Sequence, residues 1–332
     1  MARRYRDSQK PISSWEVASF KHSYTGTSSI PHWQLRNLLK PAGELVPLED
    51  QEQSVLFINE RKICLITMKK EDAKPIEIVT VDFLPYCFDS QYGYLAVGGE
   101  SGFLAVYKVQ LFELKLIWKG VIGRSPINSV ELYNKNNSIL LIVSINDGTV
   151  KILSVPSMSI YLNGMFPVPI NHAVLNDKGD MLVAVGDSLD VYVYGVENDK
   201  IQEYAIFTEA EDHSYCCSWH PDNRTIAVGS QDGSLNIWDL RYASRSTKSG
   251  QTLAQFRAYQ KSTSVNPIRS VKFTKSGSMD LLAFAEQSSY VSIVDTRTYE
   301  NRQILHIREK NRLAHTDIAG ISFPSTSESL YI

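Results

Sequence analysis

The histidines and cysteines are the residues of this sequence best able to hold a metal or attack a substrate. There are seven histidines and four cysteines. No two histidines have the HExxH spacing of a zinc hydrolase, and no two cysteines form a CxxC pair. Cys216 and Cys217 are adjacent, so on a strand they would point to opposite faces and serve as apolar filler. The sequence also lacks a GxxxxGK[ST] loop and a GxSxG elbow. It therefore predicts a protein that is not an enzyme and binds no metal or cofactor.

Charged residues are the second group whose spacing suggests a function. Eight basic residues and no acidic residue fall within 241–275, whereas six acidic residues and one lysine fall within 197–212. Such runs are either solvated loops or patches that select and steer a charged partner. The basic stretch therefore predicts, as an alternative to plain surface loops, a site for a phosphopeptide, a phosphoinositide or nucleic acid. Few aromatic residues are interleaved with these charges, which disfavours nucleic acid.

The whole chain has the composition of a folded globular protein. It has 332 residues, of which 43% are apolar and 21% charged, and its net charge is −2. No apolar run reaches the ~18–20 residues of a membrane span, and the first residues, MARRYRDSQK, lack the apolar core of a signal peptide. These features predict a soluble protein of the cytoplasm, with the nucleus as the alternative.

A repeat organises most of the chain. Five stretches share a β-rich run, a polar turn, a run such as LLAVG, a second turn and a third β-rich run: 80–109, 127–155, 170–196, 215–240 and 267–296. The last apolar residue of the first run recurs every 43 to 54 residues, and a sixth unit starts at 314. Asp147-Gly148 and Asp232-Gly233 are hairpin turns between such runs. Four antiparallel strands repeated at this period are typical of an all-β propeller.

Particular residues in these units resemble the WD-repeat family. Trp238-Asp239 matches its signature dipeptide, His220-Pro221 matches its common turn, and His315-Thr316-Asp317 matches the opening of a repeat. The resemblance implies a degenerate WD-repeat β-propeller in which six residues stabilise the blades: Asp147, Asp232, Trp238, Asp239, His315 and Asp317. Only one unit keeps Trp-Asp, so apolar packing must replace the family's buried hydrogen-bond network in most blades.

The ends of the chain decide how such a ring closes. We expect six blades, the last shared by both termini and completed by the strand-like runs 54–58 and 63–68. The alternative is that 43–75 form a blade of their own and that a seventh blade is incomplete. Residues 1–42 are expected to be a basic arm, with seven basic and two acidic residues up to position 40 and a short helix over 31–39, and 43–332 to be the propeller.

The function expected from these features is that of a scaffold or adaptor for other proteins. The motif HWQLR at 32–36, together with 212–240, is similar to fungal WD-repeat proteins that resemble substrate receptors of GID-type ubiquitin ligases. This resemblance implies that the chain recruits substrate peptides to a multi-subunit complex. The partner-binding residues are expected on loops of one propeller face and in the basic stretch: Arg124, His213, Tyr215, Arg257, Lys261 and Arg269. Two alternatives are an anionic ligand bound by 241–275 and an enzyme with a site on the propeller axis.

Overall fold

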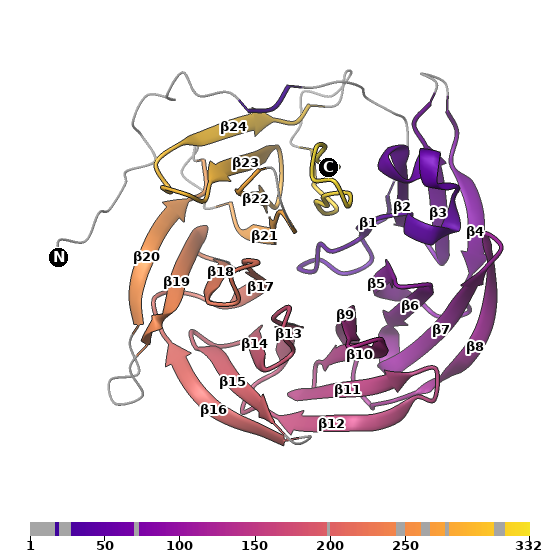
Figure 1. Ribbon diagram of the computed structural model, residues 1–332, viewed down its shortest axis with the longest axis horizontal. Helices are drawn as coiled ribbons and strands as arrows, with labels where there is room; N and C mark the ends of the chain where they lie inside the picture. Colours follow the sequence, from indigo (N-terminus) through magenta and orange to yellow (C-terminus); the bar gives the residue numbers. More distant parts are fainter. Residues whose placement is uncertain are drawn as a thin grey trace.

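The protein is a ring of six antiparallel sheets around a central channel (Figure 1). The computed structural model describes residues 17–19, 28–69, 73–197, 200–243, 250–259, 266–275, 279–308 and 316–332. Each sheet has four strands that are consecutive in the sequence, and the first strand of each sheet lies nearest the channel (Figure 1). The six expected blades are therefore confirmed.

The first three blades use the chain up to residue 165. Blade one contains β1 (Leu39–Pro41), β2 (Ser54–Asn59), β3 (Lys62–Thr67) and β4 (Ile76–Thr80), with 3-10 turns η1 (Gly43–Leu45) and η2 (Leu48–Gln53) after β1. Blade two contains β5 (Pro85–Gln91), β6 (Tyr94–Gly99), β7 (Phe103–Gln110) and β8 (Glu113–Val121), with η3 (Glu100–Gly102). Blade three contains β9 (Ile127–Lys135), β10 (Ser138–Ile145), β11 (Thr149–Val155) and β12 (Ser159–Met165).

The other three blades follow the same plan. Blade four contains β13 (Ile170–Leu175), β14 (Met181–Gly186), β15 (Val191–Glu197) and β16 (Lys200–Phe207). Blade five contains β17 (Ser214–Trp219), β18 (Thr225–Ser230), β19 (Ser234–Ala243) and β20 (Gly250–Arg257). Blade six contains β21 (Ile268–Phe273), β22 (Leu281–Glu286), β23 (Tyr290–Asp295) and β24 (Arg302–His306).

The hairpin turns form where the sequence predicts them. Gly148 and Gly233 follow the aspartates of the two Asp-Gly turns and have φ values of 86° and 73°. Only glycine adopts this backbone region without strain. At Gly148 there is also no room for a side chain, because a Cβ would lie 2.8 Å from the Phe166 carbonyl oxygen.

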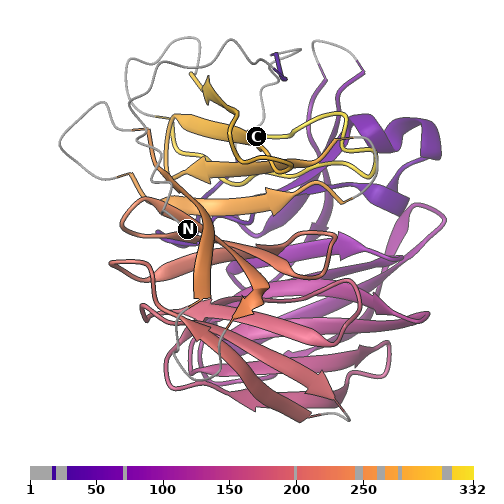
Figure 2. The same ribbon diagram turned by 60° about the vertical axis from the view of Figure 1, so that its left-hand side comes forward.

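Neighbouring blades stack face to face (Figure 2), and apolar side chains fill the space between them. Ala96 and Leu104 of blade two, for example, share one buried cluster with Ile127 and Leu141 of blade three. Such inter-sheet packing supplies most of the stabilisation, because burial removes apolar surface from water on both sides. The second strands of the blades, such as β14, β18 and β22, are accordingly buried runs rather than strict alternations.

Trp238 shows what replaces the family's hydrogen-bond network. Its ring is 1% exposed and stacks on Phe207 of blade four, with centroids 5.1 Å apart and an interplanar angle of 12°. Its indole nitrogen has no hydrogen-bond partner among the described residues. Apolar packing therefore holds this tryptophan even in the one blade that keeps Trp-Asp.

The expected sharing of one blade by both termini is wrong. The runs at 54–58 and 63–68 lie in β2 and β3, between β1 and β4 of blade one, so blade one is complete without the C-terminal residues. The short strand β1 lies in the segment expected to be part of the basic arm, and it is the innermost of the four strands of blade one. This strand also moves the start of the propeller to Leu39.

The ring is instead closed by the segment 316–332, which lies between blades six and one (Figure 1). Ile318 and Ile321 pack on Ala283 and Ala285 of blade six. Tyr331 packs on apolar residues of blade one, and its hydroxyl donates to the Glu52 carbonyl oxygen at 2.6 Å. This segment forms two isolated bridges rather than a blade.

The short helix expected over 31–39 is also absent. This segment bends at residues 32–34 and then runs extended into β1. The Leu38 amide donates to the Ala319 carbonyl at 3.1 Å, and the Leu38 carbonyl accepts from the Ile58 amide at 3.4 Å. Leu35 and Leu38 are buried. Contacts with two distant parts of the chain thus satisfy backbone groups that a helix would have paired locally.

Candidate functional site at the entrance of the channel

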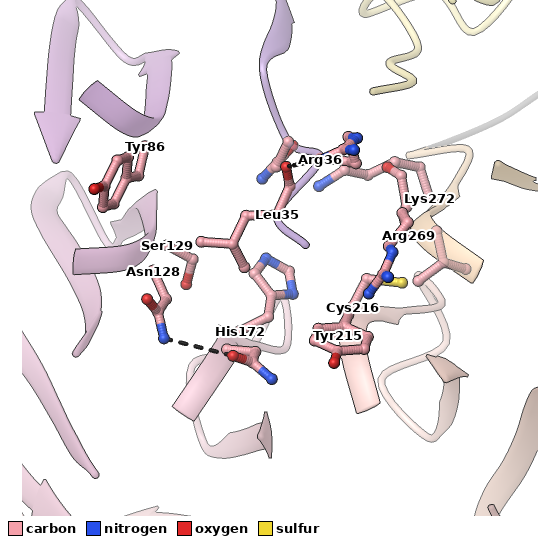
Figure 3. A pocket seen from close by; sticks show the side chains of 14 residues that line it. Leu35, Arg36, Tyr86, Asn128, Ser129, His172, Tyr215, Cys216, Arg269 and Lys272 are labelled. Atoms are coloured by element: carbon pink, nitrogen blue, oxygen red, sulfur yellow. Dashed lines mark hydrogen bonds between the residues drawn. The ribbon is translucent and has the colours of Figure 1, made fainter. Parts of the chain in front are cut away.

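A repeated backbone irregularity builds the entrance of the central channel. In the innermost strand of blades two to six, the register shifts at one residue near the strand start, which leaves that residue without a partner in the next strand. The shifted residues are Tyr86, Asn128, Asn171, Tyr215 and Arg269. Such bulges re-aim a side chain out of the regular pleat. All five side chains line a single pocket, together with residues 35–37 (Figure 3). We call these five residues and Arg36 the entrance ring.

Two members of the entrance ring connect neighbouring blades. Asn128 donates to the Ile170 carbonyl oxygen at 2.9 Å, and Asn171 donates to the Ser214 carbonyl oxygen at 3.1 Å. Each amide thus satisfies a buried carbonyl of the following blade. These two asparagines therefore hold the geometry of the ring.

Tyr215 and Arg269 form the second pair in the ring. The Arg269 guanidinium lies 4.3 Å from the centre of the Tyr215 ring, in a cation–π contact. Its Nε and Nη2 both donate to Gln287 Oε1, at 3.3 and 3.0 Å. Its Nη1 has no hydrogen-bond partner in the part of the chain that the structure describes, although the residue is only 3% exposed. Burial lowers the pKa of Arg269 and raises the pKa of Tyr215.

Arg36 enters the ring from the segment that precedes β1. Its Nη1 donates to the carbonyl oxygens of His32 and Leu35, at 2.8 and 3.1 Å, and its Nε has no hydrogen-bond partner. Burial lowers its pKa to about 10, while Asp317 acts in the opposite direction. Arg36 is therefore still a cation at neutral pH.

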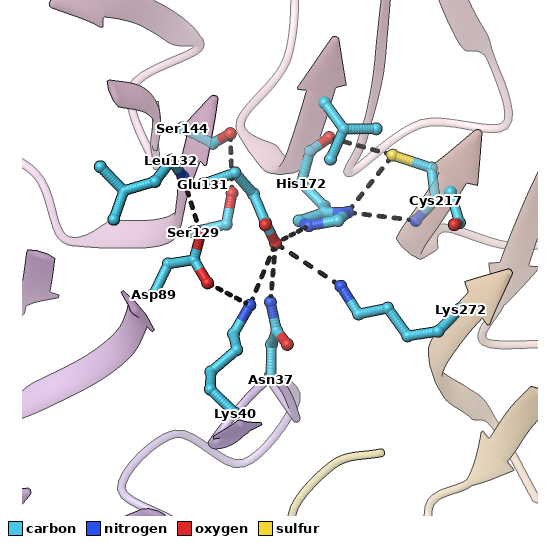
Figure 4. A network of polar contacts seen from close by, with 12 residues as sticks. Asn37, Lys40, Asp89, Ser129, Glu131, Leu132, Ser144, His172, Cys217 and Lys272 are labelled. Atoms are coloured by element: carbon cyan, nitrogen blue, oxygen red, sulfur yellow. Dashed lines mark hydrogen bonds and ion pairs between the residues drawn. The ribbon is translucent and has the colours of Figure 1, made fainter. Parts of the chain in front are cut away.

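Below the entrance ring, a charged network fills the channel (Figure 4). Glu131 Oε1 accepts from Asn37 Nδ2 at 3.0 Å and lies 3.5 Å from Lys40 Nζ and 3.6 Å from Lys272 Nζ. Lys40 also pairs with buried Asp89 at 3.2 Å. Two carboxylates thus face two ammonium groups. Asn37 and Lys40 come from the N-terminal segment, so the network fixes that segment in the channel.

His172 joins this network in a defined protonation state. Its Nδ1 accepts the Cys217 amide proton at 3.2 Å, so its own proton is on Nε2, which lies 3.1 Å from Glu131 Oε1. Burial lowers the pKa of His172.

Cys217, His172 and Glu131 follow the order of a nucleophilic triad, with the Cys217 sulfur 3.3 Å from Nδ1. Burial, however, raises the pKa of Cys217 well above its usual range, and the residue is 1% exposed. The thiol thus stays protonated and out of reach of a substrate.

The structure brings together only two of the predicted partner-binding residues, Tyr215 and Arg269. Arg124 and His213 are exposed on the loops that lead into β9 and β17, a few residues before ring positions. Arg257 lies at the end of the outer strand β20, where it pairs with Asp232 at 3.6 Å. Lys261 lies outside the described residues.

The basic stretch 241–275 does not form one patch among its described members. Arg241 pairs with Asp239 within β19, the third strand of blade five, whereas Lys272 pairs with Glu131 in the channel. Lys275 donates to Gln91 of β5 at 2.6 Å. The reason is topological, because β20 is the outermost strand of one blade and β21 the innermost strand of the next.

The residues expected to stabilise the blades make local contacts. Asp147 Oδ1 accepts the Thr149 amide proton at 3.0 Å, and Asp232 Oδ1 accepts that of Ser234 at 2.8 Å. Both contacts tighten the turn that precedes a strand. Asp239 binds Arg241, and Asp317 forms a bridge with Ser288. His315 lies outside the described residues.

Five residues of the entrance ring and the charged network were not predicted as site residues from the sequence: Arg36, Tyr86, Asn171, Glu131 and His172. A signal for the ring existed, because its members occupy the same position near the start of successive repeats. Aligning the repeats on that position would have selected Tyr86 and Asn171 beside Tyr215 and Arg269.

No helix among the described residues has the length and hydropathy needed to cross a membrane. Within the same residues, no three His, Cys, Asp or Glu side chains gather in a way that could hold a metal ion.

Comparisons with known proteins agree with this architecture. The family described as "WD domain, G-beta repeat" matches residues 204–239, and an uncharacterised protein domain, DUF2415, matches residues 267–306. The uncharacterized protein C4G3.03 of Schizosaccharomyces pombe is 27% identical over 312 residues, which cover 91% of this chain and 84% of that protein.

Two solved structures show the same fold at low sequence identity. The WD40 β-propeller domain of Doa1 superposes with a TM-score of 0.64 at 13% identity, over 89% of this chain and 88% of that chain. Sqt1 from Chaetomium thermophilum superposes with a TM-score of 0.60 at 15% identity, over 88% and 75%. The chain is thus a six-bladed β-propeller with the WD40 fold, and residues 204–239 match a WD40 repeat.

Proposed function

We propose that this propeller is a non-enzymatic adaptor that binds a peptide segment of a partner protein at the entrance ring. The observation that carries the proposal is the ring itself: five consecutive blades each re-aim one side chain toward the same channel mouth. Tyrosine and arginine anchor protein interfaces more often than other residue types. A rigid set of sheets also presents such residues with little loss of conformational freedom on binding.

The space in the channel favours a protein partner over a small-molecule substrate. Residues 35–40 and their network fill the axis, and the free volume at the entrance is about 20 Å³, room for a single water molecule. A drug-sized ligand needs a pocket of roughly 300 Å³ or more. The alternative of an enzyme with an axial site therefore has less support than an adaptor that is contacted from outside.

The finer part of the proposal is that the adaptor recruits substrate peptides to a larger complex, such as a ubiquitin ligase. Its support is the sequence resemblance carried by residues 32–36 and 212–240. His32 and Trp33 of that motif lie at the channel mouth, where His32 contacts the Tyr86 ring at 5.3 Å and Trp33 is 69% exposed. All four cysteines are free and buried, which fits a reducing compartment such as the cytoplasm or nucleus.

Affinity purification with mass spectrometry tests the proposal. The tagged chain is compared with Tyr215→Ala and Arg269→Gln, and with the matched controls Tyr242→Ala and Arg297→Gln at exposed positions away from the ring. We expect a set of co-purifying proteins that both ring variants lose and both controls keep. Circular dichroism verifies that all four variants are folded. Identical partner sets in the ring variants and the wild type would refute the ring as the binding surface.

A further inference from the structure

The entrance ring holds two cations whose hydrogen bonding is incomplete. Arg36 and Arg269 are 5% and 3% exposed, and one nitrogen of each, Nε of Arg36 and Nη1 of Arg269, has no hydrogen-bond partner among the described residues. Both residues line the same pocket (Figure 3), and burial together with these two arginines lowers the pKa of the neighbouring His32. A buried donor to which nothing binds is costly, and a charged one is costlier still.

The two lysines that contact Glu131 are neutralised. Lys40 pairs with Asp89 and Glu131, and Lys272 pairs with Glu131. By contrast, no carboxylate of the described residues forms an ion pair with Arg36 or Arg269. Asp317 and Asp212 act on these two arginines only from a distance. The mouth of the channel therefore carries an uncompensated positive charge directly above a balanced network.

We infer that Arg36 and Arg269 together bind a carboxylate group of a partner peptide. This inference rests on the proposed function and names the chemistry that its site would recognise. Nε of Arg36 and Nη1 of Arg269 place unpaired donors on two separate cations, and two cations suit the two oxygens of one carboxylate. A carboxylate is planar and smaller than a phosphate group, which suits the narrow mouth.

Tyr215 and the surrounding backbone explain why these donors stay available. The cation–π contact with Tyr215 and the two bonds to Gln287 hold the Arg269 guanidinium in one orientation, with Nη1 free. The two bonds from Nη1 of Arg36 to its own segment fix the second guanidinium in the same way. Because both donors are pre-positioned, little conformational entropy is lost when a carboxylate binds.

Thermal unfolding of the full chain gives the first test. Sodium acetate is titrated against sodium chloride at constant ionic strength, so that only the nature of the anion changes. We expect acetate to raise the Tm of the wild type, because a ligand that binds only the folded state stabilises it. The rise should persist in Arg124→Gln, which removes an exposed charge near the ring, and disappear in Arg36→Gln and Arg269→Gln. Equal rises in all four proteins would overturn the inference.

Ligand-observed NMR titration with three short peptides identifies the source of the carboxylate. One blocked glycine peptide carries a single glutamate, the second carries glutamine instead, and the third has no acidic side chain but a free C-terminus. Binding of the first peptide assigns a side-chain carboxylate, and binding of the third assigns a chain terminus. Either should weaken by at least about tenfold in Arg36→Gln, which keeps the inference testable if Arg269→Gln fails to fold. Equal binding of the glutamine peptide would overturn it.

The two proposals can fail separately. If Tyr215→Ala loses its cellular partners whereas Arg36→Gln and Arg269→Gln keep them, the adaptor role stands and the carboxylate inference is refuted. If the purified chain binds the acidic peptide but captures the same proteins with and without an intact ring, the carboxylate site stands and the adaptor role is refuted.

Discussion

Replacing Glu131 by glutamine should destabilise the propeller by about 3 kcal/mol, because Glu131 balances the charges in the channel. It lies 3.5 Å from Lys40 Nζ and 3.6 Å from Lys272 Nζ. Glutamine keeps the shape and can still accept the His172 proton, but it leaves two ammonium groups facing one carboxylate. Breaking a buried ion pair costs ~3–5 kcal/mol. The lower end applies because Lys40 keeps Asp89 and the Lys272 side chain is 23% exposed.

Urea unfolding at neutral pH, analysed by linear extrapolation, measures this loss. Glu113→Gln is the matched control, since Glu113 is exposed on β8, and it should change the free energy of unfolding by less than about 0.5 kcal/mol. The double variant Glu131→Gln/Lys272→Gln removes one charge of each sign and should recover ~1–2 kcal/mol of the loss. Surface substitutions usually change the free energy of unfolding by less than about 0.5 kcal/mol. A change no larger than this for Glu131→Gln would refute the charge-balance argument.

The pH dependence of the same difference follows from the pKa of Glu131. The neighbouring ammonium groups and His172 hold this pKa well below its usual range, although burial opposes them. A carboxyl group with a depressed pKa stabilises the folded state above its unfolded pKa, ~4.3, and loses that contribution as the pH falls through the folded pKa. The stability difference between wild type and Glu131→Gln should therefore be constant at neutral pH and shrink in acid. An unchanged difference down to acid pH would contradict this assignment.

Three further substitutions test other parts of the fold by urea unfolding or proteolysis. Gly148→Ala should destabilise the protein by ~1–3 kcal/mol, because Gly148 has a positive φ and lies close to the Phe166 carbonyl oxygen. Gly43→Ala should cost less, because Gly43 has a positive φ but open space around it. Equal losses would contradict the close approach at Gly148. Trp238→Phe should cost about 2–3 kcal/mol through the cavity it leaves in a buried stack, and an unchanged stability would contradict the packing role of the ring. Tyr331→Ala should make the segment 316–332 more sensitive to limited proteolysis, without a change in the strand content measured by circular dichroism. Unaltered cleavage would show that the Tyr331 contact does not fix this segment between blades six and one.

The blades could be predicted from sequence because their determinants are local. Asp232-Gly233 and the flanking β-rich runs specify a hairpin within about twenty residues, and the same pattern recurs in five units. Trp238 belongs to the one unit that keeps Trp-Asp, and even there its ring stacks on Phe207 without a hydrogen bond from its nitrogen to a described residue.

The features that were missed depend on residues far apart in the chain. The segment 31–39 has apolar positions that suit a short helix, but its backbone pairs with Ile58 and Ala319 instead. Lys272 reads as part of a surface charge run, yet its strand is the innermost of blade six and its partner is Glu131 of blade three. Five members of the ring depend on register shifts, which no single repeat reveals but which the innermost strands of blades two to six share.

The seam between blades six and one has a consequence for biosynthesis. Tyr331 bonds to Glu52, 279 positions earlier in the chain, whereas most strand pairs join neighbours in the sequence. Contacts of such long sequence separation form slowly because the intervening loop must be closed first. On the ribosome, blades two to six can pair their strands as they emerge, while the flank of blade one waits for residues 316–332. Until then, the apolar side chains around Val55 and Phe57 lack the cover that Tyr331 provides, and this interval is when the nascent propeller most needs a chaperone.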